Sequence, residues 1–116
     1  MVWLDRSFSG LLILAGIVHA VDSFHYYSDE LTLLWSVCAS LFIILIGVIG
    51  LMRASRPGDR ALGWICLVSG LAWIAVAVWF GQVTGDPTRI HLLIVIAVTL
   101  GMCVFSVRTI VLAKGS

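Results

Sequence analysis

Charge is the first thing this sequence lacks. Only 11% of its 116 residues are Asp, Glu, Lys or Arg, whereas 61% are hydrophobic, and the mean hydropathy is +1.13. Ordinary globular domains carry about 25% charged residues, so this composition excludes a typical soluble domain. The net charge of +1 and the scattered basic residues also argue against nucleic acid as a partner, because nucleic-acid binding needs a basic patch. The composition indicates a small integral membrane protein with the lipid bilayer as its surroundings.

Cysteine is equally sparse. Cys38, Cys66 and Cys103 each stand alone inside a hydrophobic stretch, and no C-x-x-C pair occurs. This spacing gives no support to a redox-exchange motif or a zinc ribbon. We expect all three thiols to be buried and to act as small apolar packing residues.

Long hydrophobic runs, in contrast, fill most of the sequence. Four of them cover approximately residues 8–24, 31–52, 61–83 and 90–113. Each run has about 17–23 residues, which is enough for a helix to cross a hydrocarbon core about 30 Å thick. Membrane-barrel strands are shorter and alternate in polarity, so helices are favoured. Because short connections make successive helices antiparallel, we predict an all-α fold, a single domain over 1–116 forming an up-down-up-down bundle of four transmembrane helices.

Basic residues predict how the bundle is oriented. Six of the seven would lie at one end of the bundle, and only Arg89 at the other; the six are Arg6, Arg53, Arg56, Arg60, Arg108 and Lys114. The positive-inside rule then places both termini on the cytoplasmic side of a bacterial inner membrane. In this scheme Arg53 belongs to a cytoplasmic loop, and no carboxylate is buried within the helices.

The most distinctive polar motif is His19-x-x-Asp22-x-x-His25, at the outgoing end of the first hydrophobic run. Residues three apart lie on one side of a helix, so the three side chains share a face. His91, which enters the fourth run from the same side, is the fourth candidate. Imidazole and carboxylate groups are good ligands for transition metals, and His19 with His91 would suit axial ligation of a haem. A metal ion and haem are therefore the candidate cofactors.

Two other interpretations of these four residues stay open. The cluster can be a structural or interfacial group of polar side chains near the membrane surface, where polar residues cost little. It can also be a proton relay or a quinone contact, since ionisable residues in transmembrane segments commonly mark such pathways.

Small residues four apart recur on three of the four predicted helices. Such pairs let helix backbones approach closely, either inside the bundle or against another subunit. The pairs form the predicted interface set, Gly16 with Ala20, Ala77 with Gly81, and Ala97 with Gly101.

In length and helix count the chain resembles the small multidrug resistance transporters, which are dimers of four-helix subunits. That family uses a glutamate in the middle of its first helix for proton–substrate exchange. The corresponding span here, residues 11–18, has no carboxylate, so the resemblance covers architecture alone.

Three functional hypotheses follow. The first is a non-enzymatic accessory or structural subunit of a membrane complex or homo-oligomer, whose outer His/Asp cluster binds a metal, cofactor or partner. The second is a small-solute or ion transporter that works as a dimer. The third is a haem- or metal-dependent redox protein. The sequence leans away from an enzyme, because it shows no G-x-S-x-G, H-E-x-x-H or phosphate-binding glycine loop.

Overall fold

The computed structural model describes residues 2–83, 85 and 90–113, and this part of the chain forms four α-helices and no strand. All four are long and apolar enough to cross a membrane. Their bounds are α1 Val2–Tyr26, α2 Glu30–Ser55, α3 Arg60–Val83 and α4 Ile90–Leu112. The predicted all-α four-helix bundle is thus confirmed.

Local capping explains where two of the helices begin. The Asp29 carboxylate accepts a hydrogen bond of 2.9 Å from the Thr32 backbone N–H and caps α2. Asp59 plays the same role for α3, since its side chain accepts from the Leu62 backbone N–H at 2.9 Å. Aspartate is among the preferred N-cap residues because its carboxylate satisfies an amide that has no partner within the helix.

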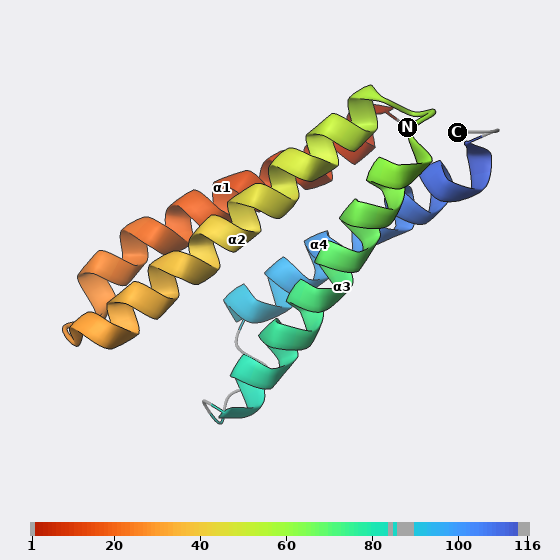
Figure 1. The fold of residues 1–116 in the computed structure, drawn as a ribbon. Helices are drawn as coiled ribbons and strands as arrows, with labels where there is room; N and C mark the ends of the chain where they lie inside the picture. The colour runs from red at the N-terminus through yellow and green to blue at the C-terminus, as the bar shows by residue number, and fades with distance from the viewer. Residues whose placement is uncertain (1, 84, 86–89, 114–116) are drawn as a thin grey trace.

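The helices associate as two antiparallel hairpins, α1 with α2 and α3 with α4 (Figure 1). Glycines permit the close approach within each hairpin. A Cβ on Gly16 would lie 3.0 Å from the Ser40 carbonyl oxygen, and one on Gly70 would lie 2.7 Å from the Cys103 sulfur. Without glycine at these positions, the paired helices would have to move apart.

The two hairpins meet at the end of the molecule that holds both termini and diverge toward the other end (Figure 1). The core follows this shape. Each of the four helices contributes one residue that is no more than 1% exposed. These residues are Leu12, Ile46, Cys66 and Met102. Trp73 belongs to the same core, as an apolar residue in the middle of its helix should. In contrast, none of the first nine residues of α4 is buried. Leu92, Val95, Ile96 and Val98 of this segment are only partly buried against the core. We call this less buried end of the bundle, opposite the termini, the open half.

Four expectations about boundaries and burial are wrong. Helix α1 begins at Val2 rather than near residue 8, and α2 runs past residue 52, so Arg53 lies in a helix and not in a loop. Asp5 is a buried carboxylate, 7% exposed. Cys38 is exposed, although Cys66 and Cys103 are buried as expected. An ion pair between Asp5 and Arg53 makes the burial of both charged groups tolerable.

Candidate functional site

A buried ion pair joins the first turn of α1 to the last turn of α2. The Arg53 guanidinium donates from Nη1 to Asp5 Oδ2 at 2.9 Å and from Nη2 to Asp5 Oδ1, so the pair is bidentate. Nη1 also donates to the Thr109 hydroxyl of α4 at 3.1 Å. Arg53 is only 1% exposed. Three helices are therefore fastened together by one guanidinium at the termini end.

The surroundings of Arg53 include further polar groups. The Cys66 thiol of α3 lies close enough to interact with the guanidinium. Arg53 Nε is buried and makes no hydrogen bond with the described residues. Sequence reasoning missed this site because Asp5 and Arg53 were assigned to polar flanks. The available signal was the position of Asp5 three residues before the first apolar run and of Arg53 directly after the second, since these two ends of antiparallel neighbours lie side by side.

The predicted histidine cluster lies at the opposite end of the molecule. His19 Nε2 is 3.1 Å from the Ser36 hydroxyl of α2, and that hydroxyl is 2.5 Å from the Ser23 hydroxyl. Ser23 in turn donates to the His19 carbonyl oxygen at 2.7 Å. Ser23 and Ser36 were not among the predicted site residues. The result is a small hydrogen-bonded network that joins α1 to α2 near the open half.

The other three predicted ligands are exposed. The ring nitrogen Nδ1 of His25 lies 3.0 Å from the Val21 carbonyl oxygen of its own helix. His91 of α4 is exposed but lies within electrostatic range of His19, as does Asp22. The described residues hold no group of three or more His, Cys, Asp or Glu side chains arranged to bind a metal ion. Metal or haem ligation here remains a prediction, and it would use the ring nitrogens that make no hydrogen bond within the described residues, Nδ1 of His19 and Nε2 of His25.

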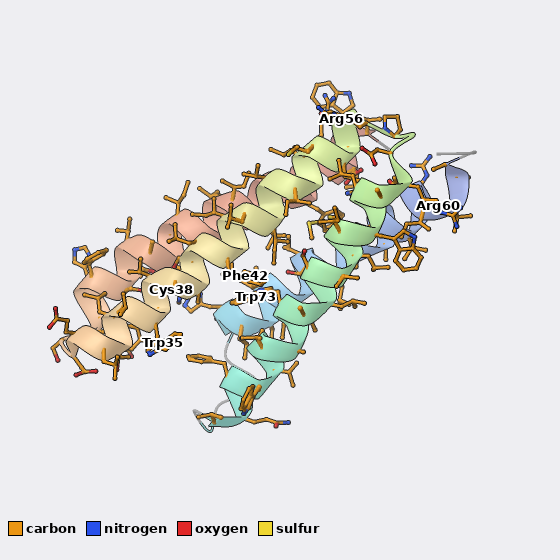
Figure 2. All side chains as sticks on the ribbon, viewed as in Figure 1. Trp35, Cys38, Phe42, Arg56, Arg60 and Trp73 are labelled. Atoms are coloured by element: carbon orange, nitrogen blue, oxygen red, sulfur yellow. The ribbon has the colours of Figure 1, made fainter. Side chains whose placement is uncertain are left out.

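One face of α2 shows where the hairpins separate. Trp35, Phe42 and Ile49 are seven residues apart and so lie on the same side of the helix. Ile49 packs against the core, and Phe42 contacts Trp73 of α3 with ring centroids 5.8 Å apart. Trp35, two turns beyond Phe42, is 68% exposed. Figure 2 shows Phe42 and Trp73 between the hairpins, with Trp35 farther toward the open end.

The six small residues predicted as an interface occupy different environments. Gly16, Ala77 and Gly81 are buried inside the chain, and Gly101 packs against the Phe8 ring. Ala20 is half-buried, and Ala97 is exposed on α4. Most of these residues thus serve packing within the chain, and Ala97 alone of the six presents an exposed surface.

Comparisons with protein-family models, with curated proteins and with solved structures give no match for this chain. Four helices with the length and composition of membrane spans support a small membrane protein. A finer assignment depends on the geometry of its two ends.

Proposed function

We propose that this chain is a non-enzymatic structural subunit of the bacterial inner membrane, with both termini cytoplasmic, and that it assembles with a second copy of itself. The observation that carries the proposal is the α2 face of Trp35, Cys38 and Phe42. This face contacts α3 at Phe42 and is left uncovered at Trp35. An apolar face that is partly engaged within the chain and then continues into an open region is suited to helix–helix contact.

A second copy fits this surface for two reasons. First, the share of each candidate span buried inside the chain is only 22–28%, so a single copy leaves most helix surface available for association. Second, a two-fold symmetric contact requires only one kind of patch, which meets itself on the partner. Cys38 is small and exposed, and it lies between Trp35 and Phe42 on this face, so two α2 helices can approach closely there.

The polar groups of the open half support the same arrangement. His91 is exposed on α4, and the network of His19 and Ser36 is only partly buried. Between two copies these groups would hydrogen-bond across the contact, which is the partner-binding role expected of the histidine cluster. Interhelical hydrogen bonds of this kind contribute about 0.6–2 kcal/mol each in membranes.

Oxidative cross-linking in native membranes tests the proposal. We expect a disulfide-linked species of twice 12.6 kDa that forms through Cys38 and disappears in Cys38→Ser. Light scattering in detergent should give a dimer that Trp35→Ala weakens. Val48→Ala is the matched control, because Val48 is 40% exposed on the same helix but points about 140° away from Trp35 and about 80° away from Cys38. A monomer at all concentrations, or cross-linking of Cys38 only to a different protein, would refute assembly with a second copy.

A further inference from the structure

A second surface, at the termini end, has the features of an anion site. A pocket of about 140 Å³ opens there beside the buried ion pair. Its polar lining consists of Asp5, Arg53, Arg108 and Thr109, and its apolar lining includes Phe105 and Leu112. The pocket therefore combines two guanidinium groups with a single carboxylate.

Among the described residues, the charges that line this pocket do not balance. Asp5 neutralises Arg53 through the bidentate pair, whereas Arg108 makes no hydrogen bond or ion pair with the described residues. In addition, Arg53 Nε is buried with no acceptor among those residues, on a side chain that is 1% exposed. Among the described residues, one exposed guanidinium and one buried N–H donor are thus left without a partner, both on side chains that line this pocket. Both would be satisfied by an anionic acceptor.

We propose that this pocket binds the phosphate group of an anionic phospholipid, with the acyl chains lying along the apolar residues at its edge. Arginine suits phosphate because its planar guanidinium presents paired N–H donors. Basic pockets between transmembrane helices on the cytoplasmic side are typical sites for such headgroups. The apolar lining beside the arginines favours a lipid over a free phosphate ion. This inference rests on the proposed cytoplasmic placement of the termini, but it is independent of assembly with a second copy, because the pocket lies at the opposite end from the open half.

The test uses the delipidated full chain in detergent and native mass spectrometry to count bound lipids. Three probes are titrated, namely phosphatidylglycerol, phosphatidylcholine and inorganic phosphate. We expect saturable binding of phosphatidylglycerol, weaker binding of phosphatidylcholine and no competition by inorganic phosphate. Arg108→Gln should weaken phosphatidylglycerol binding about fivefold, the effect of one basic residue near an anionic headgroup.

Arg56→Gln is the matched control. Arg56 is exposed at the same end (Figure 2) but does not line the pocket, so its loss removes the same charge without touching the site. The affinity of Arg56→Gln for phosphatidylglycerol should differ from that of the wild type by less than about twofold. Arg108→Lys should retain most of the phosphatidylglycerol binding. Equal losses in Arg56→Gln and Arg108→Gln would overturn the proposal, as would equal binding of the two lipids. Displacement of the lipid by inorganic phosphate would overturn the assignment to a phospholipid.

Discussion

Arg53 and Asp5, 48 positions apart in the sequence, form a buried bidentate ion pair that holds the ends of α2 and α1 together. The same guanidinium reaches Thr109 of α4. The hairpins meet where this contact lies and diverge away from it (Figure 1). The pair thus marks the closed end of the molecule.

Breaking one side of this pair should be costly. Asp5→Ala leaves a buried guanidinium without its counter-ion, and we expect a loss of about 3–5 kcal/mol in the free energy of unfolding. The double variant Asp5→Val with Arg53→Met removes both charges and should lose much less. Thermal unfolding in detergent measures both effects, with the exposed Arg6→Gln as the control. If Asp5→Ala is as stable as the wild type, the ion pair does not stabilise the closed end of the molecule.

Two glycines of α1 offer a matched comparison of helix packing. A Cβ on Gly16 would lie 2.6 Å from Ile44 Cγ1 and 3.0 Å from the Ser40 carbonyl oxygen, so Gly16→Ala should cost about 1–3 kcal/mol. A Cβ on Gly10 meets nothing within 4 Å, and Gly10→Ala should stabilise α1 by about 0.5–1 kcal/mol through helix propensity. Unfolding by denaturing detergent measures the stability of both variants. Equal stability of the two variants would contradict close packing of α1 on α2.

The three thiols should differ sharply in accessibility. Cys38 is exposed, whereas Cys66 and Cys103 are buried. A maleimide added to the folded protein, diluted in mild detergent until it is monomeric, should therefore modify Cys38 first and the other two only after denaturation. Mass spectrometry of the labelled chain gives the stoichiometry. Rapid labelling of Cys66 before unfolding would mean that the core around Arg53 is open.

The Asp29 cap of α2 predicts that the folding stability of the protein depends on pH. Hydrogen bonds from the Thr32 hydroxyl, and then from its backbone N–H, lower the pKa of Asp29 below its ordinary value of 3.8. Because the folded-state pKa is depressed, this contribution to stability is present above pH 3.8 and is lost as the pH falls through the lowered value.

Asp29→Ala should therefore lower the melting temperature at neutral pH, and the difference from the wild type should shrink in strong acid. Asp29→Asn should keep most of the cap, since asparagine is also a preferred N-cap residue. If Asp29→Ala lowers the melting temperature by the same amount at neutral pH and in strong acid, the ionised carboxylate has no role in the cap.

The sequence by itself determined the four helices, because apolar runs of bilayer-spanning length have few other ways to satisfy their backbone amides. The Asp29 cap that begins α2 was not predicted from the sequence. Two of the basic residues that predict the orientation, Arg89 and Lys114, lie outside the described residues, and which side faces the cytoplasm stays a prediction.

Only the tertiary structure decided which side chains meet. These helices are apolar on every side, so periodicity does not fix how each one is rotated against its neighbours. Close approach at Gly16 and Gly70 sets that rotation. It then places Arg53 against Asp5, joins His19 to Ser36, and leaves Trp35 uncovered. Contacts of this kind depend on the relative positions of rigid helices, which a linear pattern of residue types does not contain.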